Sequence, residues 1–303
     1  MKLTHLRYIT AVAERGSLRA AARHLGVAQP AITRSIREIE HELGVSLFER
    51  LPRGVVLTAM GEAFLRRAAA IQNELRLATD EIAQMRGDTT GQVSFTLSSA
   101  VQMALLPRVM APFRARYPDV YQIAREGTFP TAEASLLEGA IDFYIGPLPE
   151  LPVGGELVVE KLFDNTRLVF GRKGHPKAGA RSLSELADAH WIRTLVATDK
   201  SAELADVFQH YGLEPPRVEM TAGSTMAIML AAAYSDLLIM LPVQWLEFVA
   251  TRELLQPFDI KETLAAPPIC IVHRARLPLT PAAEYLADLF RRAAQHHVKA
   301  RAA

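Results

Sequence analysis

The chain has 303 residues, of which 50% are hydrophobic and 22% are charged. This composition is typical of folded globular domains, and the length favours two or three of them. No run approaches the roughly 18 consecutive apolar residues of a membrane-spanning helix. Charges interrupt the first apolar stretch and no small-residue cleavage site follows it, so we expect a cytoplasmic protein without a signal peptide or membrane association.

The charge distribution and the cysteine content narrow the function further. The net charge is only +1, but residues 1–58 hold nine Lys or Arg against five Asp or Glu, whereas residues 88–303 hold 21 against 24. A basic N-terminal segment is typical of a protein that binds a polyanion, although an ordinary solvated surface has a similar excess. Cys270 is the single cysteine, which excludes an intrachain disulfide and a two-cysteine redox switch, and it lies in an apolar run.

The first predicted elements are three helices near the N-terminus. Apolar residues recur at helical spacing from Leu3 to Ala13, and a second helix begins at Ser17, a good capping residue. Gly26 ends this helix, and Pro30 starts the next one because proline suits the first helical turn. Two helices joined by a tight glycine turn indicate a helix-turn-helix, whose second helix enters the major groove of DNA.

The helix that follows the turn has two different faces. Ile32, Ile36, Ile39 and Leu43 share one face and should pack on the first two helices. The opposite face carries amide, hydroxyl and guanidinium groups, which contact base edges and phosphates in protein–DNA complexes. A solvated helix surface is the alternative for any single one of them. The predicted DNA-contacting residues of this region are Ser17, Arg19, Gln29, Pro30, Thr33, Arg34 and Arg37.

A short hairpin, or wing, is predicted directly after this helix. The sequence "RLPRG" forms its turn, the β-branched "VVLT" forms a strand, and Thr58 can cap a further helix. Arg50 and Arg53 lie at the turn. Arginines on a wing beside a recognition helix commonly contact phosphates or the minor groove, so we expect both to bind DNA.

Residues 1–61 resemble the N-terminal domain of LysR-type transcriptional regulators. The resemblance rests on "GSLRAAARHLGVAQPAITRSIREIEHELGVSLFERLPRGVVLTAMG". Ala28, Thr33 and Met60 depart from the residues usual in the family, and Ala28 removes one hydroxyl that would cap the helix or contact phosphate. The resemblance implies that DNA is contacted above all by Gln29, Pro30, Thr33, Arg34 and Arg53.

One long helix is predicted over residues 59–87. Its apolar residues alternate steps of four and three, which is the seam of a coiled coil. A seam this narrow suits a partner helix better than a globular core, although packing within one chain is an alternative. The resemblance also implies that this helix is the dimerisation element. The predicted seam consists of Phe64, Ala68, Ile71, Leu75, Ala78, Ile82 and Met85.

Residues 88–303 alternate strands and helices after the hinge sequence "RGDTTGQ", which predicts an α/β domain with a mainly parallel sheet. The predicted strands are 92–97, 121–127, 143–147, 166–171, 190–197, 236–242 and 267–274. The predicted helices are 98–120, 130–142, 182–189, 201–212, 224–234 and 280–297.

The same part of the chain resembles the effector domain of LysR-type regulators, through "YPDV", "EGAIDFYIG", "GHP" and "IMLP". This resemblance implies two lobes with the periplasmic-binding-protein fold, joined by crossing segments near 161–166 and 264–270. Lobe I would comprise about 91–161 and 270–303, and lobe II about 166–264. The resemblance leans toward members that sense aromatic sulfonates or carboxylates. Ser235 and Asp236 depart from the Gly-x-Gly turn of many members.

Ligands of open α/β sheets bind beyond the carboxyl ends of the strands, where helix N-termini favour an anion. The residues at these ends are mostly hydroxyl-bearing, and several could instead only cap helices. Arg193 and Lys200 are candidates to balance a carboxylate. The predicted effector-binding residues are Ser98, Ser99, Thr128, Phe129, Pro130, Gly146, Thr194, Thr198, Ser224 and Thr225.

No hydrolase, metalloprotease, P-loop or dinucleotide motif occurs, so we expect no catalytic residue, metal or cofactor. The expected fold is α+β multidomain: a winged helix-turn-helix at 1–58, a linker helix at 59–87 and a two-lobed effector domain at 88–303. The expected function is regulation of transcription through double-stranded promoter DNA and a small organic-acid effector. A dimer, a tetramer and contact with RNA polymerase follow from the resemblance. The alternative is a stand-alone solute-binding protein or an enzyme of the same two-lobed fold.

Overall fold

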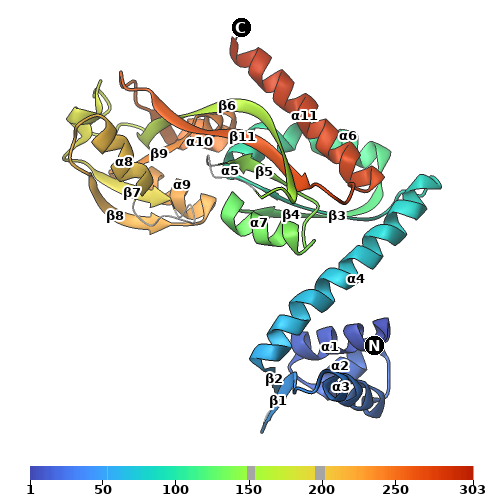
Figure 1. Cartoon of the computed structure of the whole chain (residues 1–303). Helices are drawn as coiled ribbons and strands as arrows, with labels where there is room; N and C mark the ends of the chain where they lie inside the picture. Colours follow the sequence, from blue (N-terminus) through green and yellow to red (C-terminus); the bar gives the residue numbers. More distant parts are fainter. Residues whose placement is uncertain (53, 149–153, 195–201, 303) are drawn as a thin grey trace. The chain divides into compact units, whose positions relative to one another are not determined.

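The computed structural model describes residues 1–52, 54–148, 154–194 and 202–302 (Figure 1). The chain divides into two compact units. The first comprises Met1–Arg86 together with Glu138–Ala140, and the second comprises Gly87–Leu137 and Ile141–Ala303. Each unit has its own buried core.

The first unit begins with three helices and a hairpin. Helices α1 (Leu3–Arg15), α2 (Leu18–Leu25) and α3 (Gln29–Leu43) are followed by β1 (Phe48–Leu51) and β2 (Gly54–Leu57). The core holds Ile9, Val12, Ala21, Ala22, Ile32, Ile36, Ile39 and Leu47. The apolar face predicted for α3 is therefore buried, except for Leu43, which lies 38% exposed in the last turn.

Local sequence explains where these helices begin and end. Gly26 ends α2 with a φ of 65°, a conformation that glycine adopts without the steric cost of a Cβ. Ser17 caps α2, accepting a hydrogen bond from the Ala20 amide at 3.4 Å. Ala28 occupies the cap position of α3 and makes no side-chain cap hydrogen bond there, as its lack of a hydroxyl requires.

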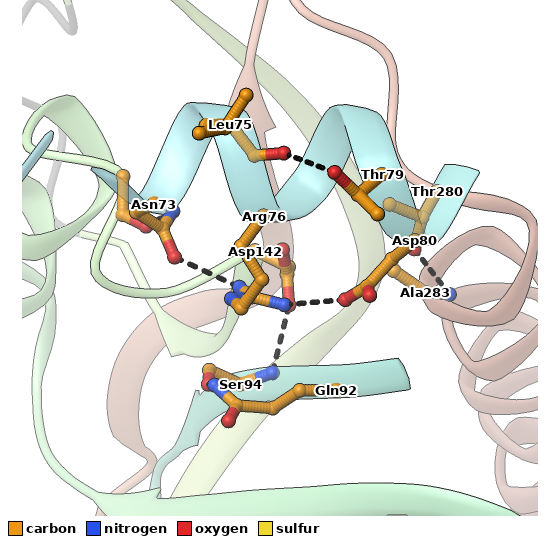
Figure 2. Close-up of polar contacts among 11 residues, drawn as sticks. Asn73, Leu75, Arg76, Thr79, Asp80, Gln92, Ser94, Asp142, Thr280 and Ala283 are labelled. Carbon is orange, nitrogen blue, oxygen red and sulfur yellow. Dashed lines mark hydrogen bonds and ion pairs between the residues drawn. The ribbon is translucent and has the colours of Figure 1, made fainter. Parts of the chain in front are cut away.

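Helix α4 (Ala59–Met85) completes the first unit. Thr58 caps it, because its Oγ1 accepts a hydrogen bond from the Gly61 amide at 2.9 Å. On this helix Arg76 lies between Asn73 and Asp80, with donor–acceptor distances of 2.8 and 2.7 Å (Figure 2). Such i,i+3 and i,i+4 pairs support an isolated helix, which suits a segment with few core contacts.

The second unit is built on one long sheet with strand order β4-β3-β5-β11-β6-β9-β7-β8, and β10 pairs with β6. Its outer pairs, β3 with β4 and β5, and β7 with β8 and β9, are parallel. The pairs that β11 makes with β5 and β6, and that β6 makes with β9 and β10, are antiparallel. The strands are β3 (Thr90–Leu97), β4 (Asp119–Glu126), β5 (Phe143–Pro147), β6 (Leu157–Arg172), β7 (His190–Thr194), β8 (Arg217–Ala222), β9 (Leu237–Pro242), β10 (Leu255–Pro257) and β11 (Leu264–Arg274).

Helices cover both faces of this sheet. They are α5 (Ser99–Ala104), α6 (Leu106–Arg116), α7 (Phe129–Leu137), α8 (Ala202–His210), α9 (Thr225–Ala233), α10 (Val249–Leu254) and α11 (Pro281–Ala302), with 3-10 turns η1 (Leu183–Leu186) and η2 (Val243–Glu247). Figure 1 shows α11 lying along α6 at the end that contains β3, β4 and β5. Along β6 the neighbours Val169 and Phe170 enter different cores, because successive side chains of a strand point to opposite faces.

The long strands β6 and β11 join the two lobes. β6 pairs with β11 from Leu157 to Arg167 and with β9 and β10 beyond, so one strand belongs to both lobes. The ladder is irregular between Ala266 and Ile269, where two prolines of β11 lack the N–H that a ladder bond requires. At the lobe I end, the Ser94 amide donates to Asp142 Oδ2 at 2.7 Å, which fixes the approach to β5 (Figure 2).

Several sequence-based predictions were wrong in detail. The sheet is mixed and not mainly parallel, because β6 and β11 cross between the lobes in opposite directions. The single helix predicted at 98–120 is two helices that meet at Leu105, where a proline lies in the first turn of α6. The helix predicted at 182–189 is only the short 3-10 turn η1. Strand β6 begins nine residues before the strand predicted at 166.

Candidate functional site

The outer face of α3 is exposed and polar in the first unit. Gln29, Pro30, Arg34 and Arg37 are exposed, and the half-buried Thr33 donates from Oγ1 to the Gln29 carbonyl oxygen at 3.2 Å. These five residues line a shallow groove on the helix, together with Glu38 and His41. The predicted two-sided helix therefore presents its guanidinium and amide groups to the surrounding solution.

The hairpin is fixed to α3 by one carboxylate. Glu40 Oε1 accepts hydrogen bonds from the amides of Leu47 at 2.8 Å and Phe48 at 3.2 Å. Hydrogen bonds to a charged acceptor are among the strongest in proteins, so Glu40 fixes the start of β1 against α3. Arg50 is exposed on β1, and Arg53 lies outside the described residues. The sequence reasoning did not identify Glu40, which is an unremarkable acid within the helical pattern.

Two further predicted DNA contacts lie on α2 and its cap. The Ser17 hydroxyl is occupied as the helix cap, whereas Arg19 is exposed. The Ser17 hydroxyl therefore has a structural role as a cap, while the Arg19 side chain is accessible from solution.

The predicted seam of α4 divides into a buried and an exposed part. Ala68 is buried, and Phe64 packs against the core of the first unit, so neither belongs to a free seam. The remaining apolar residues lie on a face that this unit does not cover, and four of them are 49–71% exposed. They are Ile71, Leu75, Ile82 and Met85, with the exposed Ala78 between them.

A cleft of about 540 Å³ lies within the second unit, between residues of both lobes. Its apolar wall includes Phe129, Ile228, Met240 and Trp245. Ligand pockets typically combine such walls with a few polar groups that fix orientation. Of the ten residues predicted to bind an effector, the cleft is lined by Ser98, Ser99, Thr128, Phe129, Pro130, Thr194, Ser224 and Thr225.

Contacts within the cleft join the lobes. Trp245 Nε1 donates to Ser99 Oγ at 3.4 Å, and the Thr225 hydroxyl donates to the carboxylate of Glu126. Ser224 accepts from the Ala227 amide at 3.5 Å and so also caps α9. Phe129 lines the cleft while its ring packs at 5.8 Å from the ring of Tyr144, so the contact with Tyr144 holds the ring at the cleft wall.

The other residues considered for the pocket do not line the cleft or lie outside the described residues. Gly146 does not line the cleft. It packs behind Ser98, where an added Cβ would collide with the Tyr144 hydroxyl and with Ser98 Cβ. Arg193 does not line the cleft either, and its Nη2 donates to Thr221 Oγ1 at 3.1 Å. Thr198 and Lys200 lie outside the described residues.

The structure adds a cation that the sequence reasoning missed. Arg167 of β6 lines the cleft, and burial lowers the pKa of its guanidinium to about 10. Its Nη1 donates to the Ala265 carbonyl oxygen at 3.4 Å. Asn165, two residues earlier on the same strand, lines the cleft as well. No sequence motif marks these two residues, because their position depends on how β6 crosses between the lobes.

In the described parts of the chain, no His, Cys, Asp and Glu side chains cluster in a way that could hold a metal ion. None of the described helices combines the length and the apolar character needed to cross a membrane.

Comparison with known families covers nearly the whole chain. Residues 3–62 match the family model "Bacterial regulatory helix-turn-helix protein, lysR family", and residues 86–295 match "LysR substrate binding domain". The HTH-type transcriptional regulator TdcA of Escherichia coli is 25% identical over 288 residues, which is 95% of this chain and 92% of TdcA. The SDS degradation transcriptional activation protein of a Pseudomonas species is 27% identical over 289 residues, 95% of this chain and 94% of that protein.

A solved structure has the same fold over the full length. The crystal structure of full-length CbnR complexed with its target DNA superposes with a TM-score of 0.72 and 23% sequence identity. The match covers 97% of this chain and 100% of CbnR.

Proposed function

The chain belongs to the LysR family of transcriptional regulators, and on that premise we propose how its residues divide the work of DNA binding, assembly and effector binding. It is a DNA-binding regulator with an effector-binding domain, and its relatives are transcriptional regulators. We propose that it has no catalytic activity of its own, and that it acts in the cytoplasm, where promoter DNA is accessible. The alternative of a stand-alone solute-binding protein does not account for the helix-turn-helix.

We propose that α3 enters the major groove. Gln29 and Arg34 would contact base edges, Thr33 would contact a thymine methyl group or accept a hydrogen bond, and Arg37 would contact phosphate. The observation that carries this proposal is the packing of α3, whose isoleucines are buried while its amide and guanidinium groups are exposed. Arg50 and Arg53 would add contacts from the wing, and Arg19 from α2.

Gel-shift titration tests this arrangement. The protein should bind the DNA upstream of its own gene more tightly than random DNA, and both affinities should fall as salt rises. Arg34→Ala should lose about 1–3 kcal/mol on the specific site and much less on random DNA, because bidentate base contacts carry sequence preference. Arg50→Ala is the matched variant, and it should weaken both complexes evenly. Equal losses on both DNAs for Arg34→Ala would remove Arg34 from base recognition.

We propose that the exposed seam of α4 pairs two copies of the chain. Four large apolar side chains on one helix face, each about half exposed or more, are costly in water and suit a partner helix. A dimer would present two α3 helices to a two-fold symmetric operator. We further propose that dimers associate as tetramers on DNA, and that the bound protein contacts RNA polymerase.

We propose that the cleft of the second unit binds a small organic acid. Arg167 supports an acidic ligand, because it brings a guanidinium to the lining of the cleft, and a guanidinium matches a carboxylate with its planar fork of donors. Binding to residues of both lobes would favour one lobe angle, and thereby the spacing and bending of the bound DNA. A thermal-shift screen of small aromatic and aliphatic acids, followed by a promoter–reporter assay of every acid that stabilises the protein, tests this. An effector that is neutral or cationic would contradict the proposed ligand class.

A further inference from the structure

Strand β6 changes character where it passes the cleft. Residues 163, 165, 167 and 169 share one face of the strand, because side chains alternate with a period of two. Phe163 lies in the core of lobe I and Val169 in a core of lobe II. Between these two apolar ends the same face carries Asn165 and Arg167, which both line the cleft. The face is therefore polar only where the strand passes the cleft, which indicates that its polar residues contact a bound molecule.

Two buried side-chain oxygens at the cleft have no hydrogen-bond partner among the described residues. Asn165 is only 6% exposed, and its Oδ1 has no hydrogen-bond partner among the described residues. Ser98 is 5% exposed, lines the same cleft from lobe I, and its Oγ likewise lacks a partner there. Buried polar atoms are nearly always hydrogen-bonded, so such atoms around one cleft indicate that a ligand completes them.

The chemistry of Arg167, Asn165 and Ser98 restricts the class of ligand that can bind. A guanidinium donates in a planar fork that matches a carboxylate. An amide oxygen only accepts, so Asn165 Oδ1 requires a donor such as a hydroxyl or an amino group. Residues two apart on a strand have Cα atoms about 7 Å apart, so one small molecule can reach both side chains.

A second carboxylate on the ligand would be unfavourable. Glu126 lines the cleft with its own carboxylate, which accepts the Thr225 hydroxyl. Like charges within a few ångströms repel each other, so a second carboxylate near Glu126 would weaken binding. A single carboxylate held by Arg167 leaves the hydrogen bond between Thr225 and Glu126 unchanged.

We propose that Arg167 and Asn165 select the effector, and that it is a monocarboxylic acid bearing a hydroxyl or amino group close to the carboxylate. This inference rests on the proposed organic-acid function of the cleft and names the substituents that the cleft recognises. Arg167 binds the carboxylate, Asn165 Oδ1 accepts from the substituent, and Ser98 hydrogen-bonds either group. The acid group is thus held by the crossing strand, and not by the helix N-termini that the sequence indicated.

Calorimetry and thermal shift with matched acids test the proposal on the full-length protein. One series is butyrate, 2-hydroxybutyrate, 2-aminobutyrate, methyl 2-hydroxybutyrate and 2-hydroxysuccinate. A second series is benzoate, 2-hydroxybenzoate and 2-aminobenzoate. In at least one series a substituted monoacid should bind about tenfold or more tighter than its unsubstituted parent, because a buried acceptor left unpaired weakens binding. The ester and the diacid should bind more weakly than the substituted monoacid.

Variants separate the two roles. Asn165→Leu should remove the discrimination, bringing the Kd of the substituted acid to that of its parent while leaving the parent unchanged. Arg167→Met should weaken every acid about tenfold or more and leave the ester unaffected, and Arg167→Lys should restore part of the affinity. Arg193→Met, outside the cleft lining, should change no Kd. A circular dichroism spectrum like that of the wild type, together with unchanged gel-shift affinity for promoter DNA, shows that each variant is folded.

The contrary outcomes are distinct. If acids bind the wild-type protein but the parent binds as tightly as the substituted acid, or if Asn165→Leu keeps the discrimination, this inference is overturned while the organic-acid function stands. If no acid of either series binds a protein that still shifts promoter DNA, the organic-acid proposal fails and this inference fails with it.

Discussion

Replacing Arg167 by methionine should make the ligand-free protein more stable. Burial in the cleft lowers the pKa of Arg167 from its ordinary value to about 10, which means that folding disfavours its charged form. Methionine keeps an unbranched, though shorter, side chain against the apolar wall and carries no charge to desolvate. A residue retained for ligand binding would thus cost the empty protein stability.

The magnitude follows from the shift in pKa. Each pKa unit corresponds to about 1.36 kcal/mol, so the full shift is about 3 kcal/mol. The cleft is open and the side chain is only half-buried, and solvent screening therefore reduces the effect. The variant also loses the long hydrogen bond to Ala265. We expect the free energy of unfolding to rise by about 1–2 kcal/mol, or the melting temperature by about 2–8 °C for a unit of this size.

The pH dependence carries its own sign. A cation whose pKa is lower in the folded state binds fewer protons there once the pH exceeds about 10, so its destabilising effect begins to decline only above that pH. Below that range Arg167 is charged in both states. The difference in stability between the wild type and the variant should therefore stay constant from about pH 6 to 9.

Thermal and urea unfolding of the effector-free protein measure this effect. Arg276→Met, at an exposed loop position, is the matched control for removal of one charge and should leave the stability within about 0.5 kcal/mol. Addition of a cognate acid should reverse the order, because the wild type alone gains full binding energy. A ligand-free Arg167→Met protein that melts below the wild type would refute the reasoning and show that Arg167 is a structural residue.

Three further predictions concern other parts of the chain. Leu75→Glu should weaken dimerisation at least about hundredfold in analytical ultracentrifugation, because a carboxylate would be buried in the seam; Ala69→Glu, off the seam, should not, and equal behaviour would reject the seam. Glu40→Ala should cost about 1–3 kcal/mol in urea unfolding of the first unit and weaken DNA binding, through loss of two charged hydrogen bonds. An unchanged midpoint would show that the hairpin is held by its other contacts, such as the hydrogen bond from the Val55 amide to the Gly16 carbonyl oxygen. Ser98→Trp should abolish the effector response in a reporter assay while sparing DNA affinity, and retained induction would move the pocket elsewhere.

The sequence determined those features that depend on neighbouring residues along the chain. Ile32, Ile36 and Ile39 repeat at the period of one helix, and Gly26 and Pro30 mark its boundaries locally. The long helix from Ala59 could also be predicted from the sequence, because a heptad pattern of apolar residues without proline is typical of a helix. The hydroxyls after strands predicted much of the cleft lining, since a rule of sheet topology places strand ends together.

Only the tertiary structure decided which polar residues reach the cleft and how the sheet is connected. From Leu157 to Asn165, β6 contains acids, a lysine and an asparagine without clear alternation of polar and apolar residues. This part is a strand because β11 pairs along it. Arg167 and Asn165 face the cleft because β6 crosses between the lobes at that point, and spacing along one strand cannot reveal what lies opposite. Pairing between distant segments is a property of the whole fold, so the antiparallel centre of the sheet and the cation of the cleft were beyond any local pattern.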